Sequence, residues 1–167
     1  MGTIISLESR PGKPAKGTFV PKNPQKYLGA NINNISFRSS WEISFMQLCD
    51  NNEAVIGWMS ESLPTNTVHK GISGIPYYNP LTKQNTLYVP DFFIIYVDRN
   101  KKQHAEVIEI KPMDEVPGFQ GKVSKIKQAR QIINAAKYKA AIVFCNQRGW
   151  FFRVMTEKDL FMKPARK

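Results

Sequence analysis

The sequence predicts an α/β domain with a central sheet flanked by helices, and three features indicate this fold. The apolar run 92–97, a polar turn at 98–102 and a return run ending at 107–112 form the pattern of a β-hairpin. The stretches 36–50 and 122–145, before and after the hairpin, carry apolar residues at the three- and four-residue spacing of helices. With 167 residues, 42% of them hydrophobic, the chain is long enough to bury one core.

Residues 1–35 differ in character from the rest of the chain. They contain four prolines, several glycines and five of the lysines and arginines, a composition that disfavours a helix. We therefore expect an extended basic N-terminal arm over 1–35 and a folded domain over 36–167. The arm could follow DNA or dock on a partner protein, or it could be a solvated tail.

The first predicted helix lies within residues 36–50. Ser39 or Ser40 can cap it, and its apolar stripe contains Trp41, Phe45 and Leu48. Glu42 falls in the first turn, where the helix dipole favours a carboxylate. Taken alone, Glu42 is better explained as an ordinary acid at a helix N-terminus.

Short strands are expected between this helix and the hairpin. Residues 55–59, continued to 63, form one, residues 75–78 could end another, and residues 86–89 lead into the hairpin. The glycine-rich segment 67–78 has no acid, and the nearest carboxylate, Glu61, could be a metal ligand or a charge at the sheet edge. Residues 92–97 are apolar on both faces, which places this strand in the centre of the sheet.

The second half of the chain should contain a loop at 112–121 and a long helix over 122–145. Residues 140–144 could instead belong to a strand, if the helix breaks near Tyr138. A strand at 150–155 and a final helical turn at 156–160 complete the predicted elements.

The long helix carries cations without compensating acids. Its basic residues are Lys122, Lys125, Lys127, Arg130, Lys137 and Lys139. A solvated helix face normally mixes charges of both signs, so this pattern favours a face that follows DNA. The formal net charge of +11 likewise indicates an extended anionic partner, nucleic acid rather than a membrane.

Other classes of protein are disfavoured. The sequence has no apolar run of membrane-spanning length, so no membrane partner is expected. Cys49 and Cys145 are far apart and fit no zinc pattern, which indicates two reduced thiols in a cytosolic setting.

The hairpin predicts a metal site. Asp91 and Glu109 are symmetric about the turn, so pairing of the strands places their carboxylates side by side. Lys111 follows Glu109 by two residues and therefore shares its sheet face. Carboxylate oxygens, with a backbone carbonyl near Ile110, are the ligands that Mg²⁺ prefers. Such an ion would polarise a phosphate and activate water.

These residues resemble the PD-(D/E)xK nuclease superfamily. Its motif matches Pro90-Asp91 followed by Glu109-Ile110-Lys111, and Glu42 on the preceding helix matches a frequent first acid. The order of elements is similar to the superfamily's restriction-endonuclease-like αβββαβ core, a mixed sheet flanked by helices. Further similarity to the head completion nucleases of T-even-like tailed phages lies in 37–42, 89–92, 108–112, 148–150 and 156–157, with a leader at 17–27. The same helix-to-lysine order occurs in TnsA-type transposase endonucleases.

The resemblance implies specific roles. Glu42, Asp91 and Glu109 would bind Mg²⁺ or Mn²⁺, and Lys111 would be catalytic in hydrolysis of DNA phosphodiesters. Asn134 and Lys137 fall on the long helix where such nucleases often place extra polar residues, although a solvated helix face explains them equally well. The substrate would be double-stranded or branched DNA near a packaged genome end. The partners would be portal and neck proteins, and the location the host cytoplasm and the virion.

Two other functions remain open at this stage. A structural, DNA-binding neck protein could retain the fold with little activity, although binding alone gives no reason to keep Glu-x-Lys beside Asp. A transposase subunit or resolvase is the other possibility.

Overall fold

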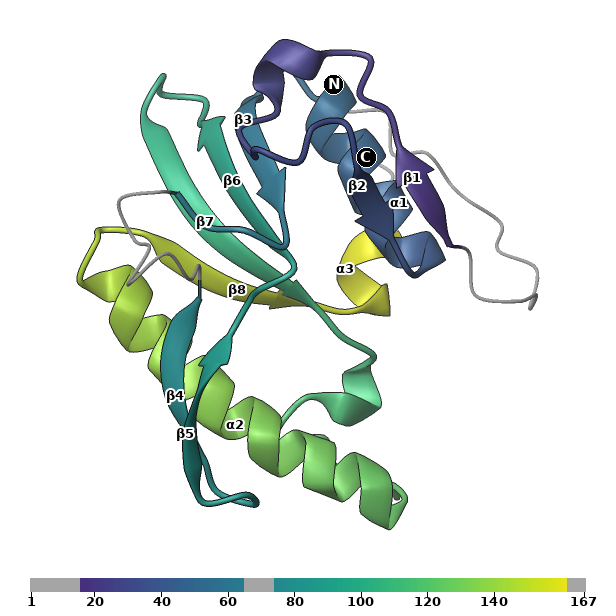
Figure 1. Cartoon of the computed structure of the whole chain (residues 1–167), viewed down its shortest axis with the longest axis vertical. Helices are drawn as coiled ribbons and strands as arrows, with labels where there is room; N and C mark the ends of the chain where they lie inside the picture. The colour runs from purple at the N-terminus through teal and green to yellow at the C-terminus, as the bar shows by residue number, and fades with distance from the viewer. Residues whose placement is uncertain (1–15, 65–73, 162–167) are drawn as a thin grey trace.

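The computed structural model describes residues 16–64 and 74–161, which form a four-stranded sheet with helices on both faces (Figure 1). The strand order is β3-β6-β7-β8, with β3 (Val55–Ser60), β6 (Phe92–Val97), β7 (Gln103–Ile110) and β8 (Phe151–Met155). β6 is antiparallel to both of its neighbours, β3 and β7, and β8 runs parallel to β7. The predicted α/β fold with a central mixed sheet is confirmed.

Two helices cover opposite faces of this sheet. The first, α1 (Ser40–Asn51), begins after Ser39, whose side chain accepts a hydrogen bond from the Glu42 N–H. From α1, Phe45 packs against Phe92 with ring centroids 4.7 Å apart. From the second helix, α2 (Lys125–Asn146), Tyr138 packs against Phe152 at 5.5 Å. Because Phe152 lies in register with Val107, beside Phe93, its ring is on the face opposite Phe92.

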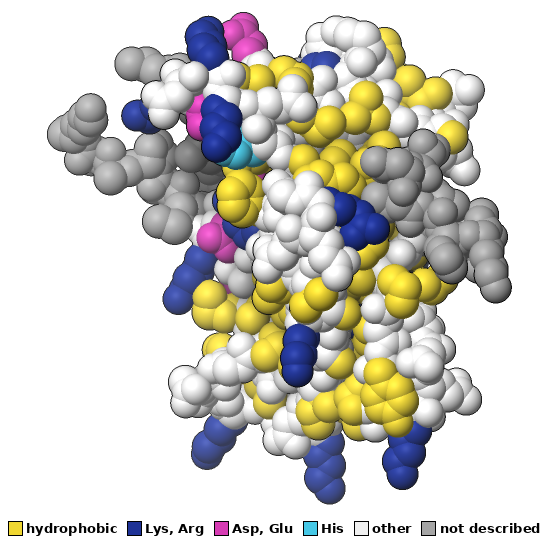
Figure 2. Space-filling view, turned by 90° about the vertical axis from the view of Figure 1, so that its left-hand side faces the viewer, with side chains coloured by type: hydrophobic (Ala, Val, Ile, Leu, Met, Phe, Trp, Pro, Cys, Tyr) yellow, Lys and Arg dark blue, Asp and Glu magenta, His cyan; other side chains and the backbone are white. Residues whose placement is uncertain are grey.

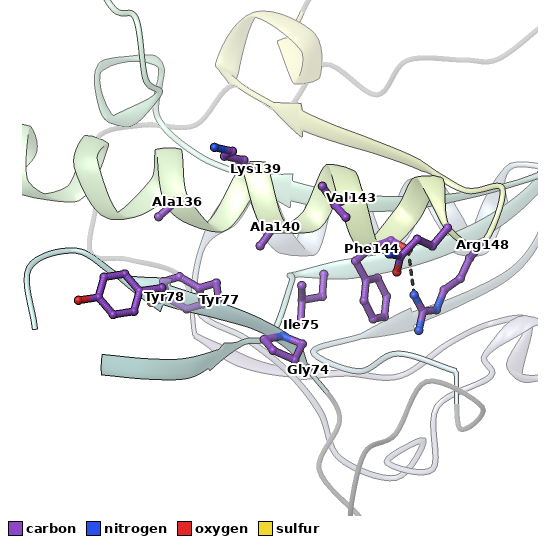
Figure 3. A pocket seen from close by; sticks show the side chains of 12 residues that line it. Gly74, Ile75, Tyr77, Tyr78, Ala136, Lys139, Ala140, Val143, Phe144 and Arg148 are labelled. Atoms are coloured by element: carbon purple, nitrogen blue, oxygen red, sulfur yellow. Dashed lines mark hydrogen bonds between the residues drawn. The ribbon is translucent and has the colours of Figure 1, made fainter. Parts of the chain in front are cut away.

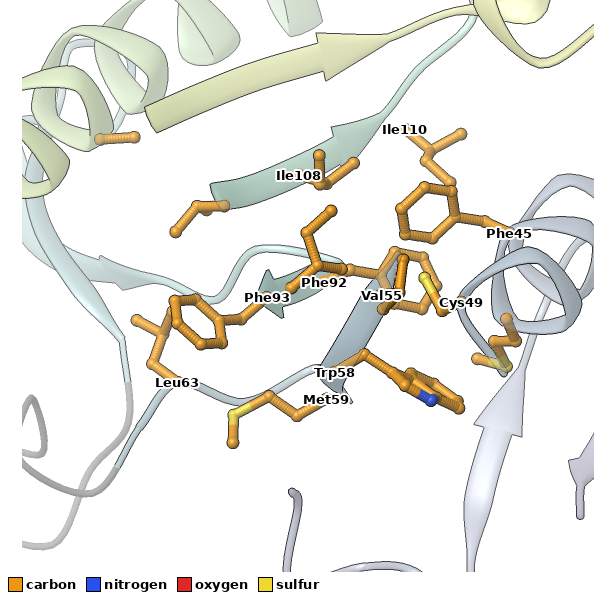
Figure 4. Close-up of a cluster of buried hydrophobic side chains, with 14 of the residues drawn as sticks. Phe45, Cys49, Val55, Trp58, Met59, Leu63, Phe92, Phe93, Ile108 and Ile110 are labelled. Carbon is orange, nitrogen blue, oxygen red and sulfur yellow. The ribbon is translucent and has the colours of Figure 1, made fainter. Parts of the chain in front are cut away.

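The core therefore consists of apolar side chains from β3, β6 and β7 enclosed by helices (Figure 4). Trp58, Phe92, Phe93 and Ile108 are each at most 1% exposed. Burial on both faces explains why residues 92–97 are apolar without alternation, and it confirms the central position predicted for this strand.

The β6–β7 hairpin has the predicted register. Phe92 pairs with Ile108, and the pairing continues to Val97 opposite Gln103. The turn between them is held by Asp98, whose Oδ1 accepts from the backbone N–H of Asn100 at 2.8 Å and of Lys102 at 3.0 Å. This local turn fixes how the two strands meet at the far end of the hairpin.

A second hairpin lies outside the central sheet. It consists of β4 (Ile75–Asn79) and β5 (Gln84–Tyr88), which pair only with each other among the described strands. Ile75, Tyr77 and Tyr88 are buried, while Pro76 and Tyr78 on the alternate face are exposed. In Figure 1 the hairpin lies along α2. Residues 67–73 of the predicted glycine-rich segment lie outside the described residues.

The long helix is unbroken, contrary to one reading of the sequence. Residues 140–144 belong to α2 rather than to a strand, because Ala141 and Cys145 face the core and are fully buried. The loop at 112–121 contains a short 3-10 helix, η3 (Met113–Glu115), and the chain continues after β8 into α3 (Glu157–Phe161). None of the helices in residues 16–64 and 74–161 is long and apolar enough to cross a membrane.

Residues 16–35 are not an extended arm. They form β1 (Gly17–Phe19) and η1 (Pro24–Lys26), and β1 pairs with β2 (Ile35–Phe37), so the expected boundary at residue 35 falls inside a strand. Phe19 and Tyr27 pack on Trp58 with centroid distances of 5.7 and 4.6 Å. Aromatic burial thus outweighs the loop-like composition of this segment. Residues 1–15 of the predicted arm lie outside the described residues.

Asp50 anchors this N-terminal segment to the end of α1. Asp50 is only 1% exposed. Its carboxylate accepts a hydrogen bond from the Lys22 N–H at 2.8 Å and another from the Asn23 N–H at 3.1 Å. The Asp50 carbonyl accepts from the Asn23 side chain at 3.0 Å and from Lys26 Nζ at 2.8 Å. These bonds give two backbone N–H groups of the N-terminal segment a charged acceptor.

Replacing Asp50 with alanine should therefore destabilise the protein by about 3 kcal/mol, because two backbone N–H groups lose a charged acceptor. Chemical denaturation measures this change. Glu53→Ala, at an exposed acid close to the same helix end, is the control and should change stability by less than about 0.5 kcal/mol. Equal stability of the two variants would contradict the anchoring role of Asp50.

Candidate active site

The hairpin register brings Asp91 and Glu109 together at its open end. Asp91 immediately precedes β6, and its Oδ2 accepts a hydrogen bond from the Ile110 N–H at 2.8 Å. Glu109 Oε2 accepts from the Asp91 N–H at 3.3 Å. Each carboxylate thus bonds to the backbone of the opposite strand, and the side-by-side placement predicted from spacing is confirmed.

Lys111 and Tyr88 hold the two oxygens of Glu109 from different sides. Lys111 Nζ lies 3.0 Å from Glu109 Oε1, as expected for residues on one sheet face. The Tyr88 hydroxyl donates to Glu109 Oε2 at 2.6 Å. Glu109 is only 2% exposed, so these contacts fix its side chain inside the protein.

The electrostatics of the pair follow from burial. Burial and the adjacent Glu109 charge raise the pKa of Asp91 to about 7, although the Ile110 N–H and Lys111 act in the opposite direction. Burial lowers the pKa of Lys111, but the carboxylates of Glu109 and Asp91 outweigh it and raise the pKa overall. The site therefore holds a protonated lysine beside two acids that do not readily ionise together.

Lys137 reaches the site from α2. Its Nζ lies 5.3 Å from the ring centroid of Tyr88 and 6.0 Å from that of Tyr77. Burial lowers the pKa of Lys137, and the charge of Glu109 offsets part of this effect. The structure thus places this predicted residue over the tyrosine that bonds to Glu109.

Glu42 and Lys111 line a small cleft next to the acid pair. The cleft has a volume of about 380 Å³, and Glu42, Ile110, Lys111 and Glu115 are among its lining residues. Glu42 Oε2 accepts from the Arg38 N–H at 2.7 Å, so its carboxylate caps the start of α1. Across residues 16–64 and 74–161, no three His, Cys, Asp or Glu side chains gather closely enough to hold one metal ion. The expected cluster of Glu42 with both acids is therefore not assembled.

Two of the cations on α2 pair with acids that lie outside the helix, which the sequence of the helix did not indicate. Lys127 pairs with Asp114 and Arg130 with Glu115, both acids coming from η3 in the predicted loop. The spacing of charges within the helix gave no sign of these partners. Glu61, considered as a further ligand, instead pairs with Arg38.

The remaining predicted DNA contacts divide into two kinds. Lys122 and Lys125 are exposed, and no ion pair with an acid is found for them among the described residues. Asn134 is 5% exposed, and its side-chain amide donates to the Glu115 carbonyl at 3.0 Å. Asn134 therefore holds η3 against α2 and does not present its side chain to solvent.

A divalent ion fits the chemistry of Asp91 and Glu109. Carboxylates are hard oxygen ligands, and Mg²⁺ binds through one or two of them with water and phosphate oxygens. The raised pKa of Asp91 reflects its burial first and the charge of Glu109 second, and a cation between the two acids would offset both effects. The Ile110 carbonyl, predicted as a further ligand, belongs to the residue whose N–H already holds Asp91.

Sequence reasoning missed Tyr88 as a site residue. Tyr88 is 2% exposed and bonds directly to Glu109, yet it belongs to the separate β4–β5 hairpin. No periodicity relates the two residues, because their strands are not neighbours in one sheet. The only available signal was its position three residues before Asp91.

The fold and the site define a class of protein. A mixed α/β sheet with Asp91 and Glu109-x-Lys111 at the end of a hairpin is similar to PD-(D/E)xK nucleases. The family model for the TnsA-like endonuclease N-terminal domain matches residues 52–157, which include this hairpin, α2 and β8. The chain belongs to this endonuclease family.

A curated relative extends the similarity over nearly the whole chain. The head completion nuclease of Enterobacteria phage T4 is 30% identical over 153 residues, covering 86% of this chain and 92% of the relative. This alignment is longer than the family match and takes in most of the residues outside it.

The acid pair predicts how stability depends on pH without metal. The pKa of Asp91 is about 7 in the folded protein against an ordinary value of 3.8, so folding favours its protonated form. This contribution to the stability of the folded state is fully present below pH 3.8, and it is lost as the pH rises through about 7. Asp91→Asn cannot ionise and retains an acceptor for the Ile110 N–H.

We therefore expect the melting temperature of Asp91→Asn, measured in a chelator, to rise relative to wild type across this pH range. Glu53→Gln, at an exposed acid outside the site, should follow the wild-type curve throughout. If the melting temperatures of wild type and Asp91→Asn changed with pH in parallel, ionisation of Asp91 would not destabilise the folded protein.

Proposed function

We propose that this protein is a metal-dependent DNA endonuclease that hydrolyses phosphodiester bonds. The observation that carries the proposal is the convergence of Asp91, Glu109 and Lys111, with Lys111 Nζ 3.0 Å from Glu109 Oε1 in a largely buried site. Membership in the TnsA-like endonuclease family supports the reaction class. Asp91 and Glu109 would hold Mg²⁺ or Mn²⁺, and the acid Glu42 of the adjacent cleft could reach water bound to it.

The metal, when bound, would polarise the scissile phosphate and lower the pKa of a bound water. Lys111 remains protonated beside the acids, so it can donate to a phosphate oxygen or orient the attacking water. Tyr88 and the Asp91 N–H hold Glu109 Oε2, which keeps this carboxylate in place independently of Lys111.

The substrate in this proposal is double-stranded or branched DNA. Lys122 and Lys125 at the start of α2 would contact its phosphates, and Lys137 would act closer to the reaction centre. Lys127 and Arg130 would contribute less, because each already pairs with an acid of η3. A net charge of +11 favours such an anionic partner over a small-molecule substrate.

The biological setting is proposed from the relative alone. The T4 protein is named a head completion nuclease, so we place this chain in phage head completion, in the host cytoplasm and then the virion. Its partners there would be portal and neck proteins, and its cut would lie at or near the packaged genome end. Isolation of tailed particles and detection of the chain in their neck tests this location.

The catalytic proposal predicts that Asp91→Ala, Glu109→Ala and Lys111→Ala each lower Mg²⁺-dependent cutting of DNA by about 10²-fold or more. Metal binding is lost in the first two, and charge stabilisation in the third. Plasmid nicking measures the effect, and a chelator should abolish it in wild type. Glu53→Ala, outside the site, is the matched acid control. Undiminished activity in all three site variants would refute the proposal.

The ion pairs of α2 predict unequal effects on DNA affinity. Lys125→Gln should reduce the slope of log affinity against log salt by about 0.9, as expected for one lost phosphate contact. Lys127→Gln should change the slope less, because its charge is paired with Asp114. Fluorescence anisotropy of labelled duplex at several salt concentrations measures both slopes. Equal losses would indicate that the Lys127 pair opens on DNA.

A further inference from the structure

A second cleft, of about 710 Å³, lies between β4 and the C-terminal half of α2 (Figure 3). Most of its lining is apolar or aromatic and includes Ile75, Tyr77, Tyr78, Ala140, Val143 and Phe144. Tyr78 and Val143 remain 55% and 53% exposed, so the cleft is open to a ligand. Its size is in the range of clefts that bind small organic groups.

The charge of this cleft is of one sign. Lys139 and Arg148 are its only charged members, and none of the described residues that line it is Asp or Glu. The Arg148 guanidinium lies 3.6 Å from the Phe144 ring centroid, and its Nη1 donates to the Phe144 carbonyl at 2.9 Å. The cleft therefore combines a fixed, flat cation with exposed aromatic surface.

The surrounding surface has the same character. The face seen in Figure 2 exposes hydrophobic side chains over much of its lower half, with Lys and Arg along the lower rim. In the sequence, no Asp or Glu occurs between Glu61 and Asp91, a segment that includes the whole β4–β5 hairpin. Nothing in that hairpin would repel a phosphate.

Contacts through Tyr77 link the cleft to the candidate active site. Tyr77 lines the cleft, and Lys137 Nζ lies near both its ring and that of Tyr88. Tyr88 in turn donates to Glu109. A nucleic-acid strand that leaves the acid pair along α2 would therefore pass Lys137 before it meets the cleft.

We propose that this cleft binds an unpaired stretch of the DNA strand, an inference that rests on the proposed nuclease function. Unpaired bases offer π-faces that stack on aromatic rings and on guanidinium planes, here Tyr78 and Arg148. Paired bases are stacked inside the duplex and cannot enter. A second copy of the chain is a poor occupant, because two molecules of charge +11 repel each other. The substrate would thus be DNA with an unpaired end or branch next to the cut.

The test compares two labelled probes, a blunt duplex and the same duplex with a single-stranded 3′ thymidine extension. Binding is measured by anisotropy in a chelator, so that no cutting is needed. Wild type should bind the extended probe about tenfold more tightly, as expected when one or more bases stack. Tyr78→Ala should remove this preference without weakening blunt-duplex binding, and Tyr78→Phe should retain it.

Two further variants sharpen the test. Gln147→Glu adds a negative charge to the cleft lining at nearly constant size and should reduce the preference. Ile56→Ala, at a side chain 45% exposed on β3, is the control and should leave it unchanged. A Tyr78→Ala variant that keeps the full preference, or loses both affinities equally, overturns the inference and leaves the cleft to a protein partner or to general duplex contact. Absence of metal-dependent cutting would instead refute the proposed function, since the binding assay does not depend on it.

Discussion

Two carboxylates, Asp91 and Glu109, lie side by side in a largely buried site, and hydrogen bonds and a lysine around them offset part of their mutual repulsion. Each accepts a backbone N–H across the β6–β7 hairpin, so the pair is built from the same register that forms the sheet. Tyr88 donates to one oxygen of Glu109, and Lys111 lies against the other. These contacts are insufficient to make both acids ionise easily, since the pKa of Asp91 is raised to about 7. A cation in this place would offset the cost of burying both charges together.

The rest of the fold supports that hairpin. Phe92 and Phe93, which directly follow Asp91, are buried on opposite faces of the sheet by α1 and α2. The N-terminal segment closes the outer edge of the sheet, where the Leu28 N–H donates to the Trp58 carbonyl at 2.8 Å and Asp50 ties the segment to α1. The position of the acids therefore depends on packing that extends well beyond the motif.

The sequence predicted what local rules determine. The hairpin register follows from a turn held by Asp98, so the placement of Asp91 opposite Glu109 could be derived by counting residues. Contacts between distant elements could not be derived in this way. Pairing of Lys127 with Asp114, the Tyr88 bond to Glu109 and the burial of Phe19 depend on how separate elements dock. Composition was misleading for residues 16–35, because a few aromatic anchors outweigh prolines and glycines in an irregular segment.

The cations of α2 consequently fall into three groups along one helix. Lys122 and Lys125, at and before its start, are exposed and suited to phosphates, whereas Lys127 and Arg130 hold η3 and so shape the cleft that contains Lys111 and Glu115. In the third group, Lys137 lies over the tyrosines between the acid pair and the cleft along β4, and Lys139 lines that cleft. A helix that looks like a uniform basic surface in sequence thus performs separate tasks in order along its length. Under the proposed function these tasks would follow a path from duplex to reaction centre to unpaired strand, and the helix would give bound DNA a direction as well as a charge to follow.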